Sequence, residues 1–129
     1  MQMTELAAGT WLRVLGAYHL ALGALQALAP GTFFESFAGY GTRNDHYIRD
    51  VSTFYLALGG VILLAAARPT WRGPVLFFAA LQYVLHAVNH LIDIGESEPG
   101  WVGPFNFVAV LALAGVFGYL LHAAPRGAR

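Results

Sequence analysis

Four long apolar segments dominate the sequence, and they leave few folds open to the chain. They run over about residues 10–29, 48–67, 73–94 and 102–122, and each approaches the ~20 residues that a helix needs to cross the hydrocarbon core of a bilayer. Short connections marked by Gly and Pro separate them. The pattern predicts an all-α protein: a four-transmembrane-helix bundle that forms one domain over residues 1–129.

The composition indicates that these segments lie in lipid rather than in water. Hydrophobic residues make up 57% of the chain and charged residues 11%, whereas ordinary soluble domains are about a quarter charged. A water-soluble bundle would lack the polar residues that cover its outer faces. All seven basic residues are arginines, and they form no cluster, which excludes nucleic acid as a partner.

The positions of the arginines predict how the bundle is oriented. Arg13, Arg68, Arg72, Arg126 and Arg129 fall on one side of the membrane if the four helices alternate in direction. Six of the seven acidic residues fall on the other side, together with only two arginines, Arg43 and Arg49. Because arginines in short loops mark the cytoplasmic side, we expect a multi-pass protein of the cell membrane with both termini in the cytoplasm.

The only long connection, residues 30–47, is expected at the outer interface. Aromatic residues alternate there with glycines and polar residues: Phe33, Phe34, Phe37 and Tyr40. This pattern predicts a short amphipathic turn or helix that caps the bundle. A lid over a binding site is the functional form of the same prediction.

Histidines and carboxylates concentrate near this outer face. His46 and Asp50 are four residues apart at the start of the second segment, so they share a helical face. The third segment carries one polar stripe that ends at the same face, made of Gln82, His86, Asn89, His90 and Asp93. Two antiparallel helices can bring the His46–Asp50 and His86–His90 pairs to one depth.

This constellation predicts a metal centre, because ionisable groups inside a membrane are costly and usually functional. The expected ligands of zinc or non-haem iron are His46, Asp50, His86 and His90. Asp93 would act as a catalytic base or orient a ring. The expected surrounding polar residues are His19, Gln82, Asn89, Arg49, Asn44 and Asn106. A haem b held by His19 and His86 is a lesser alternative.

Two hypotheses about function follow. In the first, the outward-facing site acts on or senses a small apolar, lipid-like or quinone-like molecule, through metal-activated water or metal redox chemistry if the protein is an enzyme. In the second, the His, Asp and Arg residues form a structural polar network or a path for protons or small solutes in a non-enzymatic accessory subunit. The lipid bilayer is the expected partner, and a homo-oligomer and a larger membrane complex both stay open.

Three features resemble a group of small four-helix integral membrane proteins common in actinobacteria, which are DoxX-like in architecture. They are Pro30 followed by Phe33 and Phe34, the run Asn44-x-His46-x-x-Arg49-Asp50, and the pair His86-x-x-x-His90. The Asn-x-His-x-x-Arg-Asp run is the most specific of these. The resemblance implies the four-helix architecture and no particular activity.

Overall fold

The computed structural model describes residues 3–125, and this part of the chain is helical without a regular strand. It contains five α-helices and one short 3₁₀ turn. These are α1 (Glu5–Leu28), α2 (Pro30–Phe37), α3 (Asp45–Ala67), the turn η1 (Pro69–Trp71), α4 (Arg72–Ile92) and α5 (Val102–Ala123). The predicted all-α class is confirmed, and each of the four expected long helices has an observed counterpart.

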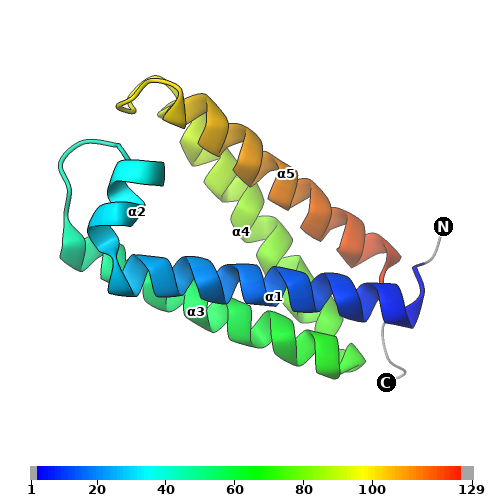
Figure 1. Ribbon diagram of the computed structural model, residues 1–129. Helices are drawn as coiled ribbons and strands as arrows, with labels where there is room; N and C mark the ends of the chain where they lie inside the picture. The colour runs from blue at the N-terminus through cyan, green and yellow to red at the C-terminus, as the bar shows by residue number, and fades with distance from the viewer. Residues whose placement is uncertain (1–2, 126–129) are drawn as a thin grey trace.

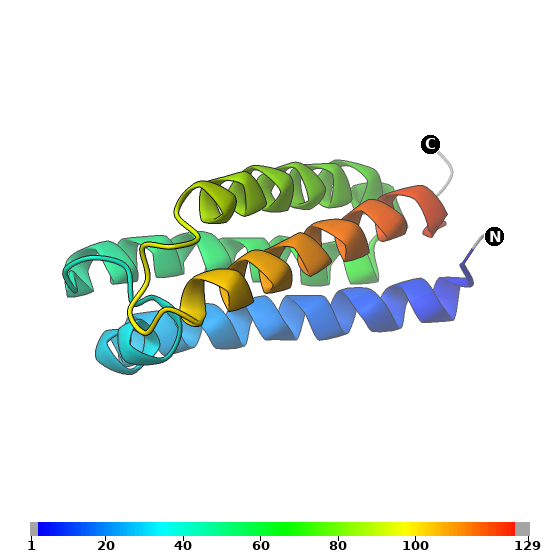
Figure 2. The same ribbon diagram turned by 90° about the horizontal axis from the view of Figure 1, so that it is seen from above.

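The long helices form two pairs that together make a V (Figure 1). α1 packs along α3, α4 packs along α5, and direct contacts between the two pairs are few. The pairs meet where the described chain begins and ends, which we call the narrow end. At the opposite, wide end they spread apart, and α2 lies between them. Figure 2 shows α2 and the loop that precedes α5 together at this wide end.

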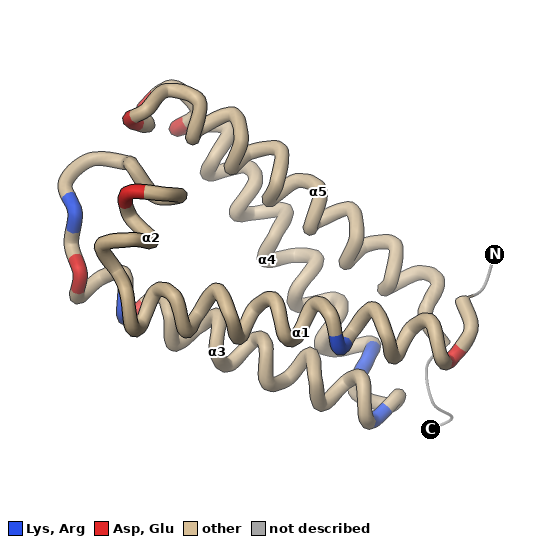
Figure 3. The backbone as a smooth tube through the Cα atoms, in the orientation of Figure 1, with Lys and Arg blue, Asp and Glu red and all other residues tan. Residues whose placement is uncertain are grey.

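Several of the helices have the length and composition of membrane spans. Asp45–Ala67, Pro69–Ile92 and Val102–Ala123 qualify individually, and the bent pair of α1 and α2 qualifies if its two helices count as one span. Charged residues gather mainly at the two ends of the bundle (Figure 3), and Arg13 lies further in, in the third turn of α1. The fold is therefore that of a helical protein compatible with a membrane.

Local capping explains why two helices begin earlier than the hydropathy pattern predicts. The side chain of Thr4 accepts a hydrogen bond from the backbone N–H of Ala7, so α1 starts before residue 10. Asn44 likewise accepts a hydrogen bond from the N–H of Tyr47 and starts α3. Pro30 disfavours helical geometry at the preceding residue, and α2 turns away from α1 by 114° there.

Glycines allow α1 and α3 to approach closely. A methyl group on Gly16 would lie 2.6 Å from the Cδ2 atom of Leu63, and one on Gly59 would lie 3.0 Å from the carbonyl oxygen of Gly16. Small residues at a helix contact of this kind are typical of packing in lipid. They hold α1 and α3 together as one wall of the V.

A buried arginine joins the helices at the narrow end. Nη1 of Arg72 donates to Oε2 of Glu5 and to the carbonyl oxygen of Pro125, each at 2.7 Å. Nε of Arg72 donates to the carbonyl oxygen of Ala65 at 3.3 Å. One side chain, only 2% exposed, thus links α4 to the start of α1, the end of α3 and the segment after α5.

Candidate functional site

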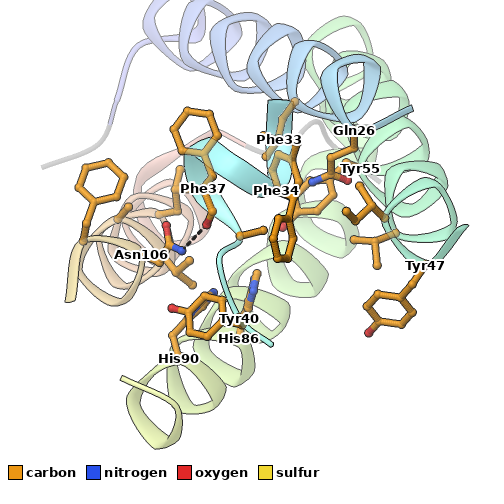
Figure 4. A pocket seen from close by; sticks show the side chains of 18 of the residues that line it. Gln26, Phe33, Phe34, Phe37, Tyr40, Tyr47, Tyr55, His86, His90 and Asn106 are labelled. Atoms are coloured by element: carbon orange, nitrogen blue, oxygen red, sulfur yellow. Dashed lines mark hydrogen bonds between the residues drawn. The ribbon is translucent and has the colours of Figure 1, made fainter. Parts of the chain in front are cut away.

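A cavity of about 570 Å³ lies between the helix pairs at the wide end (Figure 4). α1 and α3 form one wall, and α4 and α5 form the other. We call residues 38–44 the strap. Together, α2 and the strap form a roof over the cavity. Small-molecule sites typically have volumes of about 300–1,000 Å³, so the cavity has the size of a ligand site.

The cavity is lined mainly by hydrocarbon and aromatic side chains. The roof contributes Phe33, Phe34 and Phe37, and the walls contribute aliphatic residues such as Leu22 and Leu113. Its polar lining consists of uncharged amide, hydroxyl and imidazole groups, and none of the described lining residues is Asp, Glu, Lys or Arg. A predominantly apolar pocket with a few polar groups is the usual form of a site for a small organic molecule.

Three hydrogen bonds attach the roof to the opposite wall. Nδ2 of Asn106 donates to the carbonyl oxygen of Phe37 at 2.6 Å, which joins α5 to α2. The N–H of Glu98 donates to the carbonyl oxygen of Gly39 at 2.7 Å. A further bond of 3.1 Å joins the Tyr40 hydroxyl to Nδ1 of His90 on α4. The expected capping segment is therefore present and closes the wide end.

An ion pair secures the far end of the strap. Nε and Nη2 of Arg43 donate to the two carboxylate oxygens of Asp45 at 2.6 and 2.9 Å. This hydrogen-bonded pair raises the pKa of Arg43 above its usual value. A methyl group on Gly31 would lie 2.7 Å from the guanidinium of Arg43. The strap therefore stays close to the start of α2 where it enters α3.

His19 is fully buried, and both of its ring nitrogens have partners. A carbonyl can only accept, so Nδ1 donates to the carbonyl oxygen of Leu15 at 2.6 Å. Nε2 must then accept from the hydroxyl of Tyr83 at 2.7 Å. With no free lone pair on this ring, the geometry gives no support to a haem held between His19 and His86.

Two buried polar atoms that belong to cavity-lining residues have no partner in residues 3–125. They are Oε1 of Gln26 and Nδ1 of His86. The ring of His86 lies beside that of His90, with 4.7 Å between the centroids. Oε1 of Gln82 also lacks a partner, but Gln82 does not line the cavity. Because buried polar groups are nearly always hydrogen-bonded, Gln26 and His86 are lining residues whose hydrogen-bonding capacity residues 3–125 leave partly unused.

The four expected metal ligands do not come together. His90 and His86 line the cavity, whereas the side chains of His46 and Asp50 are 88% and 65% exposed and contact each other at 3.4 Å. Residues on a helix are about 100° apart, so the buried Ile48 faces nearly opposite to His46. Among the described residues no group of three or more His, Cys, Asp or Glu could hold a metal.

The other expected site residues are divided between the cavity and the surface. Asn44 and Asn106 line the cavity, each also fixing a piece of backbone. Arg49 and Asn89 are exposed. Asp93 is half-buried at the end of α4 and does not line the cavity. The cavity geometry therefore gives Asp93 no support as a catalytic base.

The lining residues that were not predicted from the sequence include Gln26, Tyr55 and Tyr83. Gln26 carried a usable signal, because it is the only amide side chain in the first apolar segment and lies two helical turns after His19. An isolated polar group in a membrane helix usually faces the interior. Tyr55 and Tyr83 carried no such signal, since a tyrosine in an apolar helix is common.

No protein-family model, no curated protein and no solved structure matches this chain. The resemblance to DoxX-like four-helix membrane proteins therefore stays a prediction. Within residues 3–125, the features of the protein that bear on its function are the size of the cavity, its lining without Asp, Glu, Lys or Arg, and the unpartnered polar atoms of Gln26 and His86.

Proposed function

We propose that this chain is an integral membrane protein that binds a small, neutral, largely apolar or lipid-like molecule in the cavity at the wide end. The observation that carries the proposal is the ligand-sized cavity with its uncharged lining. A charged molecule would lose its hydration there without gaining a counterion. The proposed activity is binding, because the residues expected to support metal chemistry do not converge.

The ligand reaches the cavity from the bilayer. Two lining side chains are also well exposed: Tyr47 on α3 is 66% exposed and Phe105 on α5 is 49% exposed. This exposure supports a cavity that opens to the surroundings of the bundle, which in this proposal are lipid. A molecule dissolved in the hydrocarbon can enter sideways between the helix pairs without crossing water.

The binding experiment is equilibrium dialysis between nanodiscs that hold the protein and empty nanodiscs of the same lipid. The probe is para-phenylphenol, a neutral and largely apolar molecule with one hydroxyl. We expect an excess of about one probe per chain on the protein side, as a single site requires. No excess over empty discs would overturn the proposal.

A matched pair of variants assigns the binding to the cavity. Ala109 lines the cavity, whereas Ala112, on the same helix, is exposed and outside it. Ala109→Phe should abolish the excess probe because the larger ring occupies the cavity, and Ala112→Phe should leave it unchanged. Equal binding by the two variants would show that the probe binds elsewhere and would overturn the proposal.

The wide end is proposed to face outward, with both termini in the cytoplasm, because Arg68 and Arg72 lie at the narrow end. The chain has no Cys, so single cysteines report without background. An impermeant maleimide should label Gly100→Cys in intact cells and Thr70→Cys only after permeabilisation. The reverse pattern would place the cavity in the inner half of the membrane and contradict this orientation.

A further inference from the structure

The two cavity-lining residues that carry an unpartnered polar atom belong to different helix pairs. Gln26 comes from α1 and is 1% exposed, and His86 comes from α4. Figure 4 shows them on opposite sides of the cavity, with Phe34 of the roof reaching between them. A ligand that bonds both side chains must therefore extend from one wall to the other, alongside the ring of Phe34.

Hydrogen bonds decide whether a ligand prefers this cavity to the surrounding lipid. Lipid tails are as apolar as the cavity walls, so contact with hydrocarbon alone gives a ligand little reason to leave the bilayer. An unpartnered buried polar group, in contrast, is costly to the protein. A ligand that satisfies Gln26 and His86 gains free energy in the cavity that the bilayer core does not provide.

The chemistry of the two atoms selects hydroxyl groups on the ligand. Oε1 of Gln26 only accepts, whereas its amide nitrogen only donates, and the amide can turn to present either one. Nδ1 of His86 likewise donates or accepts, according to the tautomer. A hydroxyl is both donor and acceptor, so it fits either state of each residue. A group that only accepts fits just one state.

We propose that the ligand is a neutral, apolar molecule with a hydroxyl at each end, one bonded to Gln26 and the other to His86. This inference rests on the proposed function and specifies its ligand class. Such a diol joins the α1–α3 pair to the α4–α5 pair at the wide end, where the two pairs spread apart (Figure 1). Arg72 already joins them at the narrow end.

The test compares biphenyl, its para monophenol and its para,para′ diphenol by the same dialysis, at equal concentrations in the bilayer. We expect the diphenol to bind about tenfold more tightly than the monophenol, as one additional hydrogen bond in an apolar site predicts. Biphenyl should bind most weakly. Equal affinities for the diphenol and the monophenol would overturn the diol inference and leave the proposed function standing.

Two leucine variants test the proposed hydrogen bonds of the ligand to Gln26 and His86, and a third is their control. Gln26→Leu and His86→Leu should each reduce the affinity for the diphenol about tenfold, to that of the monophenol. Gln82→Leu is the matched control, since its amide oxygen is also unpartnered but lies outside the cavity. Monophenol binding by the single variants shows that they are folded. A tenfold diphenol advantage that persists in both would overturn the inference.

The two proposals fail in distinguishable ways. If none of the three ligands exceeds its level in empty discs, the proposed function fails. If all three bind and Ala109→Phe removes them, but hydroxyls make no difference, only the diol inference fails.

Discussion

The hydroxyl oxygen of Tyr83 lies 2.7 Å from Nε2 of His19 in the middle of the bundle. His19 belongs to α1 and Tyr83 to α4, so this bond connects the two helix pairs. The rings of Tyr55 and Phe117 pack against His19, with centroids 6.1 and 5.7 Å away. Because Tyr55 and Tyr83 also line the cavity, this cluster forms its floor, where the helix pairs begin to diverge.

Tyr83→Phe should destabilise the protein. Removing the hydroxyl leaves Nε2 of His19 buried without a donor, which costs ~1–3 kcal/mol. Tyr55→Phe is the matched control, because its ring packs in the same cluster but its hydroxyl makes no hydrogen bond with the described residues. Denaturant unfolding followed by circular dichroism measures both. Equal losses of stability would show that the bond contributes nothing.

Gly59→Ala and Gly60→Ala are adjacent changes on α3, and we expect them to change the stability of the protein in opposite directions. A methyl group on Gly59 would lie 2.9 Å from Cγ of Leu20 on α1 and force the helices apart, at a cost of ~1–3 kcal/mol. Gly60 has no neighbour within 4 Å of its would-be methyl group. Alanine there should stabilise the helix by up to ~1 kcal/mol.

Unfolding curves of the two variants and the wild type decide this prediction. If Gly59→Ala is as stable as Gly60→Ala, then α1 and α3 do not pack through this glycine.

The sequence predicts the positions of residues along the helix axes much better than their directions around each helix. Segment length and prolines locate the long helices. Capping by Thr4 and Asn44 makes α1 and α3 begin a few residues earlier than the hydropathy pattern predicts. Depth alone suggested that His46 would meet His86. It does not, because hydropathy does not identify which helices form pairs, and His46 lies on the exposed side of α3.

The candidate site was predictable only in part, because the sequence indicates which segments lie near it but not which side chains face one another. The aromatic segment with Phe33 and Phe34 was expected to cap the bundle, and it forms the roof of the cavity. His86 was expected as a metal ligand, and it lines the cavity beside His90 without two further ligands among the described residues. The partnership of His19 with Tyr83 depends on a contact between residues 64 positions apart, which local periodicity cannot specify.

Gly39→Ala should loosen the roof of the cavity. A methyl group on Gly39 would overlap the carbonyl oxygen of Glu98, so the hydrogen bond between these residues would break. We expect backbone amides of residues 30–44 to exchange hydrogen about tenfold faster, since loss of ~1.4 kcal/mol raises the open population tenfold. Hydrogen exchange read by mass spectrometry measures this directly.

Gly100→Ala is the control for the roof prediction, because its would-be methyl group has no neighbour within 4 Å. Its exchange should match the wild type. Unchanged exchange in Gly39→Ala would mean that the strap is not held through Glu98, and that Asn106 and His90 suffice to attach the roof.

Arg72→Met should separate the helices at the narrow end. The change removes the donor to the carbonyl oxygens of Ala65 and Pro125, and hydrogen bonds to a charged donor contribute ~1.5–3 kcal/mol each. Glu5→Gln should change stability by less than ~1 kcal/mol, because the Glu5 side chain is 61% exposed and water replaces its partner. Arg68→Met, an exposed neighbour, controls for the loss of positive charge. The expected order of stability is therefore Arg68→Met, then Glu5→Gln, then Arg72→Met. If Glu5→Gln were as damaging as Arg72→Met, the ion pair rather than the two carbonyl bonds would hold the narrow end together.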